Sequence, residues 1–199
     1  ISDPTITIAG NPVTATGNNT NWAGSYILQD GDTEGSVGFN ITFLDQAANP
    51  GIAVTATTDG GSVTFDKTAT DLSTLTVDLT DASDSGVSNS DDLTNNTTPT
   101  FTISGLTSVG AIGDELYLVI GTDTVSNQIV TANSVSFTST TLTNRVLPYL
   151  ATVVSRDGAG NLSDPTPPLK FRIDTQAPST GNILNLLTED DSGFLDTDN

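Results

Sequence analysis

The chain has 199 residues, of which 24 are acidic and five are basic, so its formal net charge at pH 7 is −19. A surface this anionic disfavours nucleic acid and anionic membranes as partners and favours divalent cations. Cysteine and histidine are both absent, which excludes disulfides and also Ser-His-Asp and Cys-His catalysis within this chain.

Short strands are predicted along the whole chain, because apolar residues alternate with polar ones at a period of two. Val37, Phe39 and Ile41 are the clearest case, since they share one face of a predicted strand. About seven strands in roughly 100 residues is the count of an immunoglobulin-like β-sandwich, so the predicted class is all-β. Strands are predicted at residues 5–8, 13–16, 26–28, 37–43, 52–56, 63–65, 75–79, 101–103, 116–120, 135–137, 149–154 and 169–173.

Two local features of the first half carry further predictions. The turn residues Asp59-Gly-Gly61 predict a hairpin that joins the strands at 52–56 and 63–65. Trp22 and Tyr26 are predicted to be bulky core anchors, and a sugar-binding surface built on Trp22 is the alternative.

An internal repeat indicates that the chain is part of a tandem array. Phe65-Asp-Lys-Thr-Ala69 matches Ile173-Asp-Thr-Gln-Ala177, which lies 108 positions later. Leu79-Thr80 matches Leu187-Thr188 at the same offset. The predicted domains are an N-terminally incomplete repeat at 1–70, a complete repeat at 71–178 and the start of a third at 179–199.

Further matches define how the two copies correspond. Asp45 and Asn49 align with Asp157 and Asn161 at an offset of 112. The predicted strand Thr5-Ile-Thr-Ile8 is matched with Leu116–Val119. The first copy then lacks its first strands, so an unpaired sheet edge is expected there, covered by a neighbouring segment.

The complete repeat contains a cluster of carboxylates with no basic residue among them. Close like charges repel unless a cation or solvent screens them. Carboxylate, hydroxyl and amide oxygens are the donors that calcium prefers, so the cluster predicts a Ca²⁺ site. The carboxylates are Asp81, Asp84, Asp91 and Asp92, and comparable ones return at Asp191 and Asp198.

Two other interpretations of this acidic loop stay open, and one reaction is disfavoured. Residues 81–92 also fit a degenerate EF-hand loop, although the flanking residues read as strands rather than helices. A solvated acidic turn, in which Asp and Asn side chains cap tight bends, is the simpler alternative. Paired carboxylates could hydrolyse glycosides, but that chemistry needs an apolar cleft, and these loops are polar throughout.

Longer motifs resemble one known family. Asp157-Gly-Ala-Gly-Asn-Leu-Ser163, followed by Phe171-Arg-Ile-Asp-Thr-Gln-Ala-Pro178, is similar to the signature of bacterial Ig-like repeats. The stretch from Asp84 to Phe101 resembles the opening of the same repeats. These repeats are the extender domains of giant secreted adhesins and biofilm proteins. The first copy departs from the pattern, because Lys67-Thr-Ala-Thr70 lacks the usual proline and Ala48 stands where glycine is usual.

The resemblance implies that calcium lies near domain junctions and stiffens the rod. Asp157 and Asn161 would then lie in the loop before the last strands, with Asp45 as the counterpart of Asp157. Asp174 would lie on the exit linker of the repeat, with Asp66 as its counterpart in the first copy.

The predicted function is therefore that of a non-enzymatic spacer, rigidified by calcium, in a large adhesin at the bacterial cell surface or outside the cell. Its expected partners are neighbouring repeats of the same chain, while a distal domain would contact glycans or other cells. Two alternatives stay open: the repeats are themselves adhesive, or they form an accessory module of a large secreted enzyme. Attachment, biofilm formation and gliding motility all use such arrays.

Overall fold

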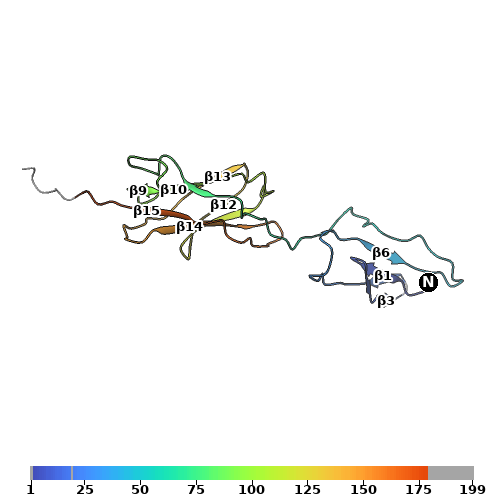
Figure 1. The fold of residues 1–199 in the computed structure, drawn as a ribbon. Helices are drawn as coiled ribbons and strands as arrows, with labels where there is room; N and C mark the ends of the chain where they lie inside the picture. Colours follow the sequence, from blue (N-terminus) through green and yellow to red (C-terminus); the bar gives the residue numbers. More distant parts are fainter. Residues whose placement is uncertain (1, 19, 179–199) are drawn as a thin grey trace, which may run out of the picture.

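The structure, a computed structural model, describes residues 2–18 and 20–178. Every regular element in these residues is a strand, which confirms the all-β class. The strands form two units that follow one another along the chain and are joined near residue 70 (Figure 1). In the described part of the chain no helix is long and apolar enough to cross a membrane.

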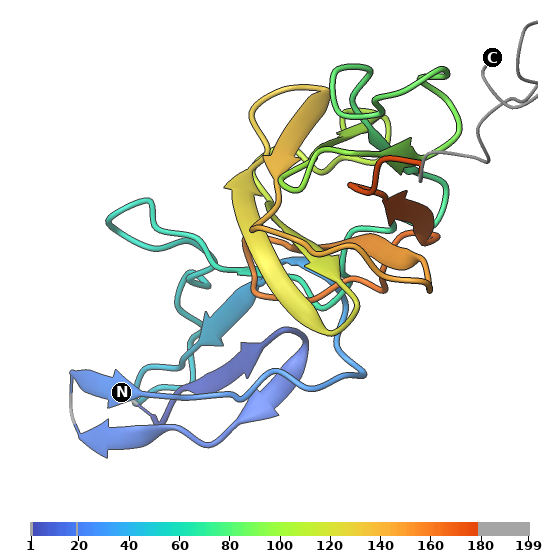
Figure 2. The ribbon, with the colours of Figure 1, turned by 90° about the vertical axis from the view of Figure 1, so that its left-hand side faces the viewer.

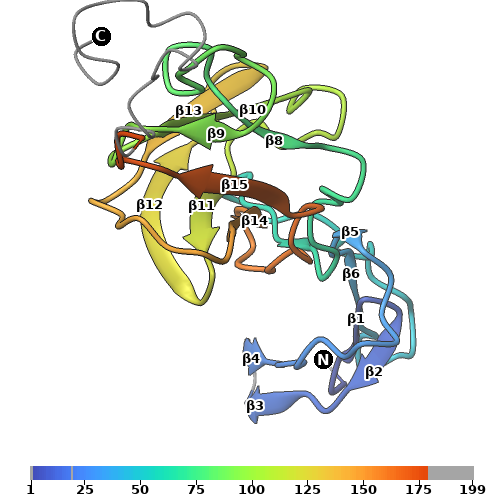
Figure 3. The ribbon, with the colours of Figure 1, turned by 60° about the vertical axis from the view of Figure 1, so that its left-hand side comes forward.

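The second unit is a sandwich of two sheets that face each other (Figure 3). Its strands are β8 (Val77–Leu79), β9 (Leu93–Thr94), β10 (Thr100–Ser104), β11 (Glu115–Ile120), β12 (Asp123–Ile129), β13 (Ser134–Thr138), β14 (Tyr149–Arg156) and β15 (Leu169–Ile173). One sheet has the order β13-β10-β8 and the other the order β12-β11-β14-β15-β9. The short strand β9 runs parallel to β15.

The alternation of apolar residues builds the core between these two sheets. Leu116, Leu118 and Ile120 face inward from β11, and all three are buried, as a period of two predicts. Phe101 from the facing sheet meets Phe171 edge to face, with ring centroids 5.0 Å apart. Both rings are completely buried, so the second unit has a closed core.

The first unit contains shorter strands. They are β1 (Thr5–Ile8), β2 (Asn11–Val13), β3 (Thr16–Asn18), β4 (Asn21–Ala23), β5 (Gly35–Ser36), β6 (Phe39–Thr42) and β7 (Thr64–Phe65). They pair in the order β2-β1-β6, with β3-β4 and β5-β7 as separate pairs. A hydrogen bond from the Val37 N–H to the Val63 carbonyl (2.8 Å) continues the β5-β7 pairing toward β6.

The main sheet of the first unit repeats part of the five-stranded sheet of the second. Ile6 of β1 pairs with Ile41 of β6, as Leu118 of β11 pairs with Val153 of β14. Ile41 and Val153 lie 112 positions apart, the offset of the internal repeat. Ile6 is therefore the counterpart of Leu118, and both are buried.

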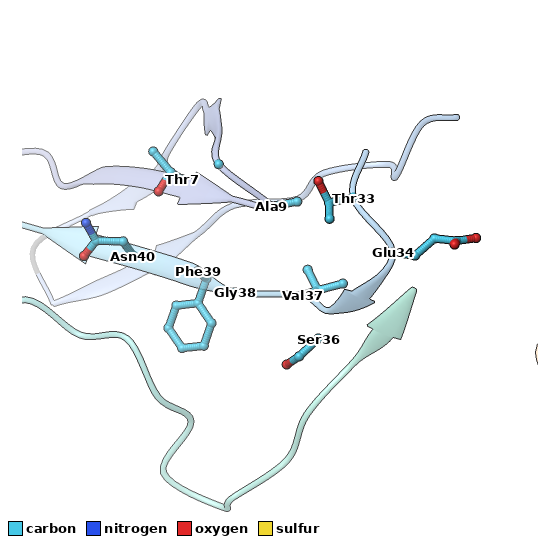
Figure 4. Close-up of a pocket in the computed structure, with 10 residues that line it drawn as sticks. Thr7, Ala9, Thr33, Glu34, Ser36, Val37, Gly38, Phe39 and Asn40 are labelled. Carbon is cyan, nitrogen blue, oxygen red and sulfur yellow. The ribbon is translucent and has the colours of Figure 1, made fainter. Parts of the chain in front are cut away.

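This sheet has an apolar face that no described strand covers. Ile6 is the one hydrophobic residue of the described first unit that is buried. Val63, the counterpart of Phe171 at the offset of 108, is 60% exposed, whereas Phe171 is 0% exposed. Figure 4 shows the ring of Phe39 projecting from β6 on the side away from Asn40. The prediction that a neighbouring segment covers the first unit stays a prediction.

The register corrects one predicted correspondence between the copies. Thr5–Ile8 matches residues 117–120, so the predicted match with Leu116–Val119 is wrong by one position. The pairing fixes this, because a slip of one residue would turn the buried side chains to the opposite face.

The predicted hairpin in the first unit is also wrong. β7 pairs with β5 and not with residues 52–56, which contribute only the isolated bridge between Val54 and Ile41. Figure 2 shows the chain between β6 and β7 as a long loop. Ile52 is 90% exposed, because no described strand faces these alternating residues.

The predicted core anchors of the first unit lie outside a buried core. Trp22, on β4, and Tyr26 are both half-buried, and residues 26–28 form no strand. The Tyr26 hydroxyl donates to Asp32 at 3.1 Å. No described strand lies above them, so these large side chains bury only one side.

Candidate functional site

The acidic loop lies at the end of the second sandwich that is remote from the first unit (Figure 1). Two backbone hydrogen bonds tie it to the last strand and the exit of the chain. The Arg172 N–H donates to the Asp92 carbonyl, and the Asp174 N–H donates to the Thr94 carbonyl, both at 2.8 Å. The loop therefore adjoins the segment that leaves the unit, and we call this the exit end.

Asp84 is the most unusual residue of the loop, because its carboxylate is buried without a basic partner. The residue is only 4% exposed. One oxygen, Oδ2, accepts a hydrogen bond from the Asp92 N–H at 3.3 Å, and the other, Oδ1, is buried without a hydrogen-bond partner. A buried polar atom without a partner is costly, so this oxygen is suited to receive a cation.

Other carboxylates lie near Asp92. Burial raises the pKa of Asp92 above its ordinary value, and the nearby carboxylates of Asp78, Asp84 and Asp91 raise it further. Asp92 also has a backbone φ of +58°, a left-handed conformation that Asp adopts more readily than most residues. The loop therefore concentrates negative charge against a tightly turned backbone.

Hydroxyl groups hold the rest of the loop in place. The Ser83 hydroxyl, itself buried, accepts from the Thr100 N–H at 2.8 Å. The Ser85 hydroxyl donates to the Asn95 side chain at 2.8 Å and accepts from the Asn95 N–H at 3.0 Å. These bonds fix the loop on β10 and beside β9.

The predicted ligands of the loop differ in their surroundings. The Asp91 carboxylate accepts from the Leu93 N–H at 3.2 Å, and Asp81 is exposed. Asp78 was not among the predicted ligands, although its position opposite the buried Val77 and Leu79 on β8 marks it as solvent-facing. Within residues 2–18 and 20–178, no group of three or more acidic side chains is placed to hold a metal ion. A cation here would therefore also need hydroxyl or carbonyl oxygens, or a turn of Asp91 toward Asp84.

A second predicted site, the turn from Asp157 to Asn161, lies at the opposite end of the same sandwich. Asp157 Oδ1 accepts from the N–H groups of Ala159 and Asn161, both at 2.9 Å, and Oδ2 accepts from the Asn161 side chain at 2.8 Å. The carboxylate therefore closes its own turn. Burial alone would raise the pKa of Asp157, but the hydrogen bonds from Asn161 and its neighbours outweigh burial and lower it.

The turn from Asp45 to Asn49 in the first unit has the same hydrogen bonds. Asp45 accepts from the N–H groups of Ala47 and Asn49, both at 2.8 Å, and from the Asn49 side chain at 2.9 Å. The Asn49 side chain is the main reason that the pKa of Asp45 is lowered. Ala48 adopts a φ of +66°, so the turn forms although alanine replaces the glycine of the other copy.

The remaining predicted ligands are divided between the two ends. Asp66 and Asp174 each accept from the N–H two residues later, that of Thr68 at 3.1 Å and that of Gln176 at 2.9 Å. Asp66 lies beside Asn161, whose side chain donates to the Asp66 carbonyl at 3.3 Å. Asp174 follows β15 at the exit end, whereas Asp157 follows the antiparallel strand β14 at the opposite end. The structure therefore does not bring these two together. Calcium binding by these carboxylates stays a prediction, and Asp191 and Asp198 lie outside the described residues.

The first unit contains a pocket of about 370 Å³ beside β6 (Figure 4). Its lining includes Thr7, Phe39 and a single charged side chain, Glu34. Glu34 accepts hydrogen bonds from the Lys67 N–H at 2.8 Å and the Thr68 hydroxyl at 2.7 Å. The one carboxylate of this pocket is therefore engaged in holding the linker between the units.

Comparison with known proteins finds a family match to the second unit. The model of a family described as "Bacterial Ig-like domain" matches residues 70–175, just over half of the chain. No curated protein matches. One similar solved structure is described as "Biofilm associated protein - BSP domain", with 14% sequence identity and a TM-score of 0.34. That match covers 89% of this chain but only 26% of the other chain.

Proposed function

Because the chain belongs to the bacterial Ig-like domain family, we propose that it is a non-enzymatic spacer in a tandem array on a large surface or secreted adhesin. The arrangement of the units is the main support. The chain enters the second sandwich at the end that faces the first unit and leaves it after β15 at the opposite end (Figure 1). Units joined in this way extend end to end, so each adds its own length to a fibre.

We further propose that the exit end binds Ca²⁺ through the acidic loop. The buried Asp84 Oδ1 without a hydrogen-bond partner supports this, as do the carboxylates that raise the pKa of Asp92. Asp84 and Asp92 would be the primary ligands, with Asp91 and loop hydroxyl or carbonyl oxygens as the remaining donors. Bound calcium would neutralise the repulsion between these carboxylates and stiffen the junction with the next repeat.

Calcium titration calorimetry tests this site. The full chain should bind calcium, and Asp84→Asn should abolish one binding event because it removes the buried carboxylate. Asp164→Asn, which changes the charge equally at an exposed position outside the loop, is the matched control and should bind as the unchanged chain does. Equal binding by the unchanged chain and Asp84→Asn would refute the site.

Small-angle scattering and a glycan array test the spacer role. An extended particle is expected with calcium, and a broader distribution of shapes is expected with a chelator if the exit end stiffens on binding. If a glycan binds the chain and Trp22→Ala abolishes that binding, the chain is an adhesive module and not a spacer. Binding of no glycan, together with an extended particle, is the result that the spacer predicts.

A further inference from the structure

We propose that the joint between the two units is closed by hydrogen bonds and needs no metal ion, so that chelation leaves it rigid. The joint consists of the linker, residues 66–70, and the side chains of both units that bind it. This inference rests on the proposed spacer role and identifies which of its junctions calcium would not control.

The second unit has a buried hydrogen-bond acceptor, Asp114, for the side chain of Thr70. The Thr70 hydroxyl donates to Asp114 Oδ2 at 2.6 Å, and the Ser155 hydroxyl donates to the same oxygen at 2.6 Å. Asp114 and Ser155 are both buried. A buried carboxylate depends strongly on its hydrogen-bond donors, so the loss of the Thr70 hydroxyl would leave Asp114 poorly satisfied. Asp114 therefore favours a hydroxyl-bearing residue at position 70 of the linker.

Asn161 makes the second contact on the same unit. Its side-chain amide donates to the Asp66 carbonyl at 3.3 Å and to Asp157 Oδ2 at 2.8 Å. Asp157 thereby orients the amide, and the amide reaches the linker. The turn that resembles a calcium loop thus has a role in the joint without any ion.

The first unit also forms hydrogen bonds with the linker, on its other side. The Glu34 carboxylate accepts from the Lys67 N–H at 2.8 Å and from the Thr68 hydroxyl at 2.7 Å. The Lys67 ammonium donates to the carbonyl oxygens of Asp30 and, at 3.1 Å, of Asp32. A five-residue segment bound on both sides has little freedom to bend.

The exit of the second unit cannot form the same joint. At the offset of 108, Pro178 stands in place of Thr70 and Thr175 in place of Lys67. Proline has no hydroxyl to donate, and threonine has no ammonium group. At the offset of 112 that relates the paired strands, Val146 stands in place of Glu34. The two ends of the second sandwich therefore use different chemistry, with hydrogen bonds at the joint and carboxylates at the exit end.

Distance measurement by pulsed electron spin resonance tests the joint in the full chain. Because the chain has no cysteine, Ser62→Cys in the first unit and Ser136→Cys in the second provide two unique labelling sites, and both are exposed. A single narrow distance distribution is expected, with the same width in calcium and in chelator. A distribution that broadens in chelator would overturn the proposal.

Substitutions at Thr70 identify the bond responsible. Thr70→Val keeps the shape but removes the hydroxyl, and should widen the distribution at least about two-fold. Thr70→Ser keeps the donor and should retain the narrow distribution, while Asn161→Ala should widen it by a smaller amount. Circular dichroism of each variant confirms that the units remain folded. A narrow distribution in both Thr70→Val and Asn161→Ala would refute the joint, whereas loss of calcium binding alone would refute only the proposed metal site.

Discussion

The two units contain the same pattern of paired strands, yet among the described residues only those of the second unit form a closed core. Leu118 and its counterpart Ile6 are both buried, but Phe171 is completely buried where its counterpart Val63 is mostly exposed. The difference arises because β8, β10 and β13 cover one face of the second unit, and no described strand covers the equivalent face of the first. Pairing within a sheet therefore sets the register, whereas burial needs the facing sheet.

The largest expected effect compares Phe171 with Val63. Phe171→Ala should lower the free energy of unfolding of the second unit by about 3–5 kcal/mol, because it leaves a cavity between two sheets. Val63→Ala should change the stability of the first unit by less than about 0.5 kcal/mol, as for most exposed positions. Urea unfolding measures both, with near-ultraviolet circular dichroism of the buried rings for the second unit and fluorescence of Trp22, the only tryptophan, for the first. A large loss in Val63→Ala would mean that another segment covers this face.

An intermediate effect compares the two Asp-Asn turns. Gly160 has a φ of +96°, so Gly160→Ala should destabilise the second unit by about 1–2 kcal/mol. An added Cβ would lie 3.7 Å from the nearest atom, in ordinary contact, so the backbone is the cause. Ala48→Gly should stabilise the first unit by a few tenths of a kcal/mol, since relief at φ +66° exceeds the entropy that glycine loses. Thermal melts of both variants check this. Shifts of the two melting temperatures in the same direction would contradict the prediction.

The smallest effect concerns the acidic loop of the second unit. Because the folded pKa of Asp92 is raised above 3.8, its ionised form is penalised at neutral pH, and the penalty disappears as the pH falls through the folded pKa. Asp92→Asn should therefore raise the melting temperature slightly at pH 7 in chelator, and the gain should vanish below pH 3.8. Asparagine tolerates the positive φ, so the backbone is unchanged.

Calcium should reverse the sign of this effect. The unchanged chain should gain more stability from calcium than Asp92→Asn, because the variant lacks one of the proposed ligands. A variant that gains as much as the unchanged chain would remove Asp92 from the site.

The sequence was sufficient to predict β8, β10, β11, β13, β14 and β15, because apolar residues such as Leu116 and Leu118 alternate with half-buried ones and the core is two-sided. It missed β9, which has only two residues, and β12, whose residues are exposed or half-buried and give no apolar face. It failed for residues 26–28 and 52–56, where the same alternation exists but no described strand covers it. The motifs located the acidic loop but did not reveal that Asp84 is the only one of its four predicted carboxylates that is buried. They also could not separate Asp157 from Asp174, because only strand direction places these two at opposite ends of the sandwich.

The parallel pairing of β9 with β15 has a mechanical consequence. The chain enters at one end of the second sandwich and leaves at the other, so tension along the proposed fibre would pull β15 lengthwise past β9. The hydrogen bonds from Arg172 to Asp92 and from Asp174 to Thr94, both 2.8 Å, lie across that movement. Under such tension they would be loaded together in shear instead of opening one after the other, so this short strand pair would resist being pulled apart.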